Sequence, residues 1–342
     1  MSIREKALAS AVAAALSMGV GAAALPAMQV QVSDWSPAVN AETVIGTDDF
    51  NTPFLDGCPA PSPNGLEFYM ASNRQTDSHG QPASMGGIDI WVARRSSVDA
   101  PWGEPENPGA PVNSSADDFC PTPQRDGKGL LFVSRRTLPD NSQCGRADIY
   151  YARRNHDGSW SEPVHLDCTV NSAGEEFSPF LVEYDDGARE LYFSSTRAGG
   201  FSPETPTSTT GDADLYVSDV TPAGDVASPV PVPGVNTAAN DFRPSLRRDG
   251  LELFFDSNRP GSVPNASGTP SFDIWSAIRD SRFVVWTAAT PLGPNVNTPG
   301  DETRPFLTWD RLTLFFGRAP GTESAASDIY VASREKITGH SR

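Results

Sequence analysis

The sequence predicts an all-β fold, a five-bladed β-propeller whose blades are four-stranded antiparallel sheets. A repeat of about 60 residues occurs five times along the chain. Each repeat divides into four short β-prone segments, and none shows a sustained apolar period of 3.6 residues. The 31 prolines and 29 glycines punctuate turns and interrupt helices, so many short strands are expected.

Three short motifs define the repeat, and they keep one order in all five copies. An Asp-Ile or Asp-Leu pair followed by an aromatic residue starts at Asp89, Asp148, Asp214, Asp273 and Asp328. An apolar run before each pair ends in Arg74, Arg136, Arg197, Arg259 and Arg318. A Val-Asn pair starts at Val39, Val112, Val170, Val235 and Val296. Such regularity indicates stacked copies of one unit.

The second repeat shows how one unit divides into four strands. Residues 120–123 lead into the turn Asp126-Gly127, and residues 130–134 are apolar. Residues 148–153 form a third segment, and residues 160–164 form the last. One such sheet cannot bury both of its faces alone, so we expect the blades to pack face to face around an axis.

The chain ends predict how the propeller closes. The fifth repeat stops after its third segment, and residues 33–40 resemble the missing fourth one. We therefore predict that residues 33–40 pair with residues 328–333, which also hides an exposed sheet edge. The alternative, an open solenoid with two caps, leaves the segment at Trp35 without a role.

The N-terminus predicts export. Arg4 and Lys6 precede a small and apolar stretch over residues 7–25, and the alanines at 22–24 offer a cleavage site. We expect residues 1–30 to be a signal peptide with a short linker, residues 31–335 one propeller, and residues 336–342 a tail. A secreted or periplasmic location follows, with no membrane span in the mature chain. A membrane anchor is the alternative for the apolar stretch.

The repeat resembles the TolB-type, WD40-like (PD40) propeller repeat. Residues 191–197 and 243–250 are good local matches, and the resemblance covers about residues 33–335. It implies a stand-alone exported propeller of a kind that often serves as a binding platform. The chain departs from the pattern in blade 5, where the run before Arg318 is shortened, and in blade 1, where an insertion precedes Cys58.

The formal net charge of −17 limits the partners. Phosphate backbones and anionic membranes attract lysine and arginine, so nucleic acid and membrane surfaces are not expected to bind. A protein or a carbohydrate is the expected ligand, of unknown identity, and the chain is expected to be a monomer. A uniformly solvated acidic surface also accounts for the charge.

An acid precedes the first strand of each repeat. Asp118, Glu176, Asp241 and Glu302 occupy one equivalent position. If these carboxylates converge on the channel mouth they repel one another, so we consider them candidates for a cation or polar ligand, with calcium the possible cofactor and otherwise none. Arg243 and Arg304, two residues further on, are candidates for neutralising them. The alternatives are turn caps in water and a catalytic carboxylate pair.

Additional acids stand beside that position, at Asp117, Glu175 and Asp301. Five-bladed propellers include glycosidases that use two or three carboxylates at the channel. The acids recur with the repeat, which favours a structural role, and no acid was identified that departs from it.

A second recurring pattern predicts ion pairs across the hairpin between strands two and three. The expected pairs are Arg74 with Asp89, Arg136 with Asp148, Arg197 with Asp214, and Arg259 with Asp273. We interpret this pattern as scaffold.

The four cysteines predict two disulfides in an exported chain. Cys58 and Cys120 hold equivalent positions on neighbouring inner strands, and Cys144 and Cys168 both fall in blade 2, so these pairs are expected. A zinc site is the alternative, although no Cys-x-x-Cys spacing supports it.

The function that this pattern favours is a non-enzymatic binding or scaffold module, with no catalytic residues. The alternative is a glycan-active hydrolase that uses carboxylates at the central channel, and a third is a structural envelope protein. No Gly-x-Ser-x-Gly elbow is present, which excludes a fused serine hydrolase.

Overall fold

The structure is a computed structural model that describes residues 31–201, 213–319 and 326–337. The predicted signal peptide and the end of the predicted tail lie outside these residues. Residues from Gln31 onward form one compact unit.

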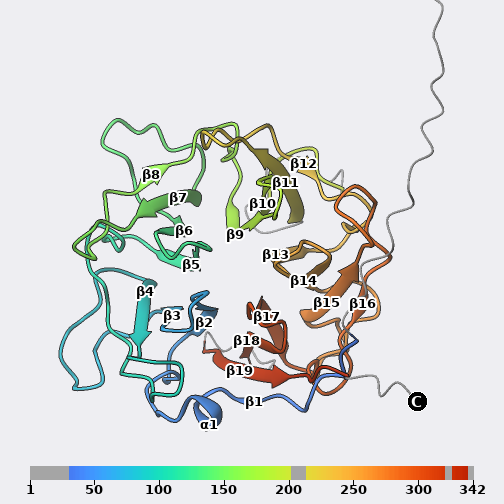
Figure 1. The fold of residues 1–342 in the computed structure, drawn as a ribbon, viewed down its shortest axis with the longest axis horizontal. Coiled ribbons are helices and arrows are strands. Elements are labelled where there is room, and N and C mark those ends of the chain that lie inside the picture. Colours follow the sequence, from blue (N-terminus) through green and yellow to red (C-terminus); the bar gives the residue numbers. More distant parts are fainter. Residues whose placement is uncertain (1–30, 202–212, 320–325, 338–342) are drawn as a thin grey trace, which may run out of the picture. The chain divides into compact units, whose positions relative to one another are not determined.

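Five antiparallel sheets surround a central axis (Figure 1), as the repeats predict. The first strand of each repeat lies innermost and borders the channel. These inner strands are β2 (Asp56–Pro61), β5 (Asp118–Pro123), β9 (Glu176–Glu183), β13 (Asp241–Leu246) and β17 (Asp301–Leu307).

The second and third strands follow outward in each blade. The second strands are β3 (Glu67–Ser72), β6 (Gly129–Ser134), β10 (Arg189–Ser195), β14 (Glu252–Ser257) and β18 (Thr313–Ala319). The third strands are β4 (Asp89–Arg94), β7 (Asp148–Arg153), β11 (Asp214–Val220), β15 (Asp273–Ile278) and β19 (Asp328–Ser333).

The outer strands are only two residues long. They are β8 (Val164–His165), β12 (Val230–Pro231), β16 (Thr290–Pro291) and β1 (Val39–Asn40). In blade 1 a single bridge between Val92 and Glu106 takes the place of the fourth strand.

The N-terminal segment closes the propeller, as predicted. Strand β1 pairs antiparallel with β19, so that Val39 faces Val331 and Asn40 faces Tyr330. The backbone N–H of Ser36 also donates to the carbonyl of Ser333 at 2.7 Å. Blade 5 is therefore built from both ends of the described chain.

The core lies within and between the blades. The apolar residue at the middle of each second strand is fully buried, and so is the aliphatic residue after each third-strand Asp. The first set is Met70, Phe132, Phe193, Phe255 and Phe316, and the second is Ile90, Ile149, Leu215, Ile274 and Ile329. The recurring motifs thus place the same packing unit in every blade.

The Val-Asn pair ties each third strand to the segment that leads to the next blade. Asn113 accepts a hydrogen bond from the N–H of Ile90 and donates to the carbonyl of the same residue. In blade 5, Asn51 makes these two bonds to Ile329. The assignment of Val39-Asn40 as the fifth copy was therefore wrong, because the insertion at residues 41–49, which includes α1 (Glu42–Ile45), separates β1 from Asn51.

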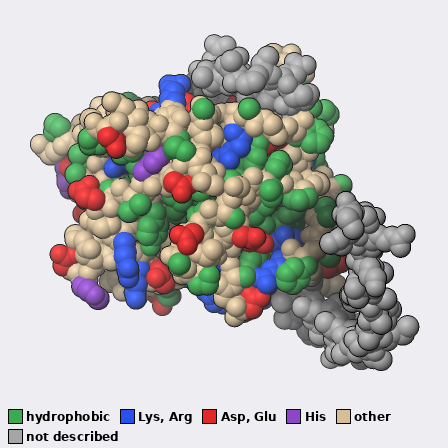
Figure 2. Space-filling view, turned by 90° about the horizontal axis from the view of Figure 1, so that it is seen from above, with side chains coloured by type: hydrophobic (Ala, Val, Ile, Leu, Met, Phe, Trp, Pro, Cys, Tyr) green, Lys and Arg blue, Asp and Glu red, His purple; other side chains and the backbone are tan. Residues whose placement is uncertain are grey.

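Acidic side chains are dispersed over the side of the molecule in Figure 2, where they alternate with hydrophobic and neutral ones and gather in no single patch. Among the described residues, no helix is both long and apolar enough to cross a bilayer.

Candidate functional site

The acids at the start of the inner strands are fully buried, and each forms an ion pair with an arginine of its own blade. Arg136 contacts Asp118 at 2.7 Å, and Arg318 contacts Glu302 at 2.7 Å. The remaining pairs are Arg74–Asp56, Arg197–Glu176 and Arg259–Asp241. These arginines end the apolar runs, so Arg243 and Arg304 were the wrong partners for the acids.

Each acid also caps the turn that enters its blade. Oδ2 of Asp118 accepts the N–H of Ser114 at 2.6 Å and its hydroxyl at 2.7 Å. The equivalent donors for Asp56, Glu176, Asp241 and Glu302 are Thr52, Ser172, Thr237 and Thr298. Both carboxylate oxygens of Asp118 are thus used inside the blade. Calcium binding by these acids stays a prediction.

Burial raises the pKa of two of these acids. It raises the pKa of Glu302 to about 7, although hydrogen bonds from Thr298 and the charge of Arg318 oppose the rise. Burial likewise raises the pKa of Glu176, against hydrogen bonds from Ser172 and Ser195. Desolvation of the charged form is the dominant cause in both.

The aspartates that begin the third strands do not pair with the arginines, so that prediction is wrong. They accept backbone N–H groups of the preceding loop instead, as Asp89 does from Met85 at 2.7 Å. Asp148, Asp214 and Asp273 accept from Cys144, Phe201 and Val263 in the same way. Burial raises the pKa of Asp273 to about 6.

A ring of bulged residues lines the central channel. The third residue of each inner strand, or the fourth in β17, has a positive φ between 46° and 58°, and a proline follows it. The ring members are Cys58, Cys120, Ser178, Arg243 and Arg304. The cavity they line measures about 30 Å³, which holds a few water molecules at most, so a sugar ring cannot enter it.

Asp256 connects the two channel arginines. Its Oδ2 lies 2.6 Å from Nη1 of Arg243, and its Oδ1 accepts the backbone N–H of Arg304 at 2.9 Å. Burial raises the pKa of Asp256, partly offset by the charge of Arg243. Burial and the neighbouring Arg243 lower the pKa of Arg304 to about 9. The channel therefore holds two guanidinium groups and one buried carboxylate.

Asp256 was not predicted from the sequence as a site residue. The residues at this position of the second strand are Ala71, Val133, Ser194, Asp256 and Gly317. The acid in blade 4 is therefore a departure from the repeat, which an alignment of the five copies reveals.

A second group of charges lies at the mouth where the inner strands begin. Nη1 of Arg135 contacts Oδ2 of Asp117 at 2.7 Å, and its Nη2 lies 3.8 Å from Oε2 of Glu175. Nη1 of Arg146 lies 3.4 Å from Oε1 of Glu175. The side chains of Asp117 and Arg135 are each 26% exposed, so solvent reaches this ion pair, whereas Glu175 is buried.

An arc of aromatic rings adjoins these charges. Phe119, Phe177 and Phe242 hold equivalent positions on three consecutive inner strands, and their ring centroids are 6.4 and 5.5 Å apart. The guanidinium of Arg135 lies 5.3 Å from the centroid of Phe119. The mouth thus combines two carboxylates on neighbouring blades with an apolar, half-buried surface.

A larger hollow lies at the opposite ends of the inner strands. It measures about 510 Å³ and is lined by turns of blades 3, 4 and 5, including Tyr184, Asp186, Asp249 and Phe283. Asp186 is paired with Arg282 at 2.6 Å, and Asp249 lies 3.3 Å from Arg311. This hollow is wide enough for a sugar ring.

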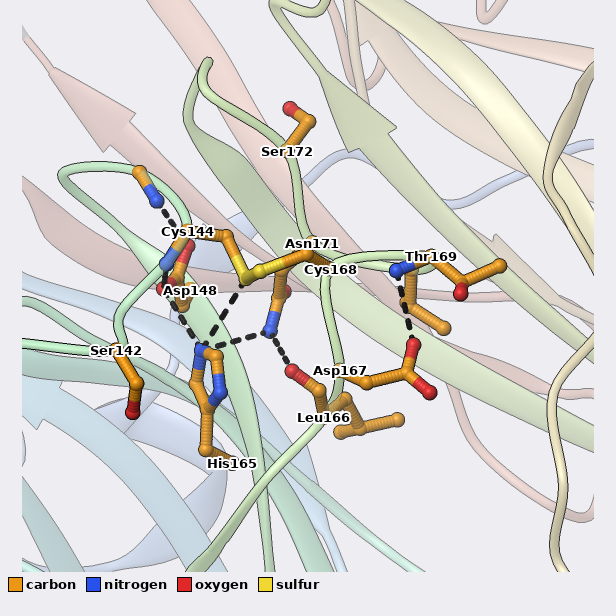
Figure 3. Close-up of a disulfide and its surroundings, with 12 residues drawn as sticks. Ser142, Cys144, Asp148, His165, Leu166, Asp167, Cys168, Thr169, Asn171 and Ser172 are labelled. Atoms are coloured by element: carbon orange, nitrogen blue, oxygen red, sulfur yellow. Dashed lines mark hydrogen bonds and ion pairs between the residues drawn. A yellow bond between two sulfur atoms is a disulfide. The ribbon is translucent and has the colours of Figure 1, made fainter.

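Both predicted disulfides are present, and the described residues contain no free cysteine. Cys58–Cys120 joins the inner strands of blades 1 and 2 within the channel. Cys144–Cys168 lies at the periphery of blade 2 beside His165 and Asp148 (Figure 3).

Comparison with known proteins finds relatives by structure only. No family model matches the sequence, and no curated protein matches it. A thermostable family-43 glycoside hydrolase has a TM-score of 0.54 at 10% identity, over 86% of this chain and 93% of the other. An endo-arabinase from Bacteroides thetaiotaomicron has a TM-score of 0.51 at 12% identity, over 86% and 99%.

A structure described as a putative TolB from Agrobacterium tumefaciens covers 90% of this chain and 100% of its own, with a TM-score of 0.46 at 11% identity. The likenesses to the family-43 hydrolase and to the endo-arabinase support the propeller fold. The prediction of a non-enzymatic binding module is contradicted by the family-43 hydrolase and the endo-arabinase, because both of these similar propellers are glycoside hydrolases.

Proposed function

We propose that the chain is a glycan-active hydrolase whose reaction site is the channel mouth between blades 2 and 3. The observation that carries the proposal is the contact of one guanidinium, Arg135, with both Asp117 and Glu175. The fold shared with glycoside hydrolases supports it.

The spacing of the two carboxylates suits glycoside hydrolysis. Because they contact two nitrogens of one planar guanidinium, they lie within about 9 Å of each other. Glycoside hydrolases place their paired carboxyl groups about 5 to 9.5 Å apart, closer for retention and further for inversion of configuration. One group protonates the leaving oxygen, and the other acts as a base or a nucleophile.

The contacts suggest how the roles divide. Asp117 makes the shorter ion pair and accepts the N–H of Ile88 at 3.0 Å, which suits a base or nucleophile. Glu175 is buried, and its Oε1 accepts no hydrogen bond from the described residues, so we assign it the role of proton donor. Phe177 and Phe242 are half-buried and offer apolar ring surface for the C–H face of a sugar.

The cavity at the ring of bulged residues is too small for a sugar, so we propose that a glycan binds at the mouth. Arg243, Arg304 and Asp256 lie deeper and are assigned to the scaffold. The acids at the start of the inner strands are committed to ion pairs and caps, so we assign the chemistry at this mouth to Asp117 and Glu175, which share Arg135.

The test is hydrolysis of arabinan and of aryl glycosides by wild type and by Asp117→Asn and Glu175→Gln. Each variant is expected to lose about 10²-fold or more in kcat with an unchanged melting temperature. Asp117→Asn is expected to keep the hydrogen bond from the N–H of Ile88. At the equivalent position Asn240 accepts the N–H of Ala213, so an asparagine side chain fits this role. Asp301→Asn is the matched control, since Asp301 serves Phe272 in the same way.

The outcomes separate the possible sites. Loss of activity in the Asp117 and Glu175 variants with retention in Asp301→Asn supports the proposal. Loss in Asp186→Asn or Asp249→Asn instead moves the reaction to the opposite hollow. Full activity in all of these variants, or no hydrolysis of any glycan by wild type, rejects the proposal.

The location is part of the proposal. Two disulfides fit an oxidising compartment, so we place the working protein outside the cytoplasm, as a secreted or periplasmic monomer. Descent from a TolB-type repeat also remains a proposal, and it rests on the sequence motifs.

A further inference from the structure

Blade 2 departs from the repeat at three positions that meet in one place (Figure 3). They are Cys144 before β7, His165 on β8 and Cys168 after β8. His165 faces Tyr150, and the residues that face the equivalent aromatic of blades 3 and 4 are Pro231 and Pro291. The imidazole is therefore not required by the blade architecture.

The side chains converge through their ligand atoms. Sγ of Cys144 lies 3.9 Å from Nε2 of His165, which lies 2.8 Å from Oδ2 of Asp148. All three atoms lie within 4.8 Å of one another. In the part of the chain that the structure describes, this is the only such cluster of three or more metal-ligating side chains.

We propose that reduction of the Cys144–Cys168 disulfide opens a zinc site with Cys144, Cys168, His165 and Asp148 as ligands. Two thiolates, an imidazole nitrogen and a carboxylate oxygen form a set that zinc binds tetrahedrally. With metal–ligand bonds of about 2.0 to 2.3 Å, neighbouring ligand atoms of a tetrahedron lie roughly 3.5 Å apart. The distance from Cys144 to His165 already approximates this spacing.

The nitrogen and oxygen ligands stay in place without the disulfide. Asp148 accepts the N–H groups of Cys144 at 2.8 Å and Gly145 at 3.0 Å, the loop-capping role that the other blades give to this aspartate. The His165 ring packs against Tyr150, with centroids 5.0 Å apart, and its Nε2 also lies 3.2 Å from Nδ2 of Asn171. Two ligands are thus positioned by the blade itself.

The disulfide controls the site because oxidised sulfur is not a thiolate ligand. Cys168 is exposed, so a dithiol reductant can attack its Sγ and release the thiolate of Cys144. The second thiol of the reductant then displaces Cys168, and the reductant leaves as a disulfide after transferring two electrons and two protons. Zinc binding displaces the two thiol protons. The site is closed in an oxidising compartment and open where dithiols are maintained.

The experiment measures zinc binding to the folded chain before and after reduction. The chain with Cys58→Ala and Cys120→Ala is reduced with dithiothreitol, desalted without oxygen and titrated with zinc against a chromophoric chelator. The reduced chain is expected to bind one zinc and to melt at a higher temperature with zinc than without it. The oxidised chain is expected to do neither at the same concentrations.

Two variants test the ligands. In blade 1, Asn107 stands at the position of His165 and contacts Asp89, so His165→Asn is expected to preserve the blade. The variant should lower the zinc affinity about 10-fold or more. Cys168→Ser leaves Cys144 as a thiol and is expected to bind zinc without a reductant. The proposal is overturned if the folded, reduced chain takes up no zinc, if zinc leaves its melting temperature unchanged, or if His165→Asn binds as tightly as its parent.

Discussion

Nη2 of Arg136 lies 2.7 Å from Oδ1 of Asp118 and donates to the backbone carbonyl of Val112 at 2.6 Å. One guanidinium therefore joins the second strand of blade 2, the first strand of blade 2 and the segment that arrives from blade 1. Arginines at the same place in the other blades make the corresponding bonds: Arg74, Arg197, Arg259 and Arg318. The contact is thus a connection between consecutive blades.

Arg136→Met is expected to lower the free energy of unfolding by about 3 to 5 kcal/mol, because it leaves the carboxylate of Asp118 buried without its cation. Glu106→Gln is the control, since Glu106 and Arg94 form an exposed pair whose loss costs less than about 1 kcal/mol. Urea denaturation of both variants checks the difference. Equal effects would show that the buried pair adds no more than a surface contact.

Removal of the closing strand is expected to destabilise the propeller. A chain that starts at residue 42 lacks β1 and Trp35, whose ring packs against Phe254 at 6.0 Å, and it exposes the edge of β19. Its melting temperature should fall by about 10 °C or more relative to a chain that starts at residue 31. Identical melting curves would mean that β1 contributes nothing to closure.

The raised pKa of Glu302 predicts a pH dependence of stability. Its folded value of about 7 lies above its ordinary value of 4.5, so the folded state keeps a proton that the unfolded state loses between these pH values. The free energy of unfolding therefore falls as the pH rises from about 4.5 to 7 and levels off above that.

Glu302→Gln removes this contribution. Between pH 5 and pH 8, wild type is expected to lose on the order of 1 to 3 kcal/mol more than the variant, measured by denaturation at both values. Asp273, with a pKa of about 6, acts in the same direction in both proteins, so the difference isolates Glu302. Parallel pH profiles would contradict the raised pKa.

The fold could be predicted from the sequence because the repeat reports blade number directly. Five copies of three motifs predict five sheets. The additional segment at Trp35 predicts that the N-terminal strand pairs with the last blade and closes the propeller. The register of that last copy could not be predicted. Val39-Asn40 matches the motif by identity, but the hydrogen bonds to Ile329 are made by Asn51, beyond an insertion whose path no pattern describes.

The partners of the repeated arginines could not be predicted either. Each arginine follows a second strand, which lies between an inner strand and a third strand, and an acid stands at the start of both of these neighbours. Arg74 is directed by Ser72, whose Oγ accepts its Nε at 3.0 Å. This bond turns the guanidinium toward Asp56 on the inner strand and away from Asp89. Asp117 and Glu175 were visible as acids, but their link through Arg135 depends on how neighbouring blades meet.

The Cys58–Cys120 bridge is expected to stabilise the contact between blades 1 and 2. Cys58→Ala with Cys120→Ala should lower the free energy of unfolding by about 2 to 5 kcal/mol, because the bridge closes a separation of 62 residues. Mass mapping under non-reducing conditions should also recover this pair and Cys144–Cys168 from wild type. A different pairing would contradict the blade register.

Asp256→Asn is expected to be among the most damaging single changes in the channel. It removes the carboxylate that compensates Arg243 and leaves two guanidinium groups close together in a cavity of about 30 Å³. A loss of about 3 to 5 kcal/mol is expected from leaving a buried charge without its partner.

The double variant Asp256→Asn with Arg243→Met should recover part of that loss, since it removes the uncompensated cation as well. Urea denaturation of wild type and both variants measures the recovery, and rising chloride should stabilise the single variant more than wild type because an anion can replace the carboxylate. Asp185→Asn is the control, as its side chain is 91% exposed and its contacts with Arg125 and Arg248 contribute little. A single variant as stable as wild type, or a double variant less stable than the single one, would show that Asp256 does not compensate the channel arginines.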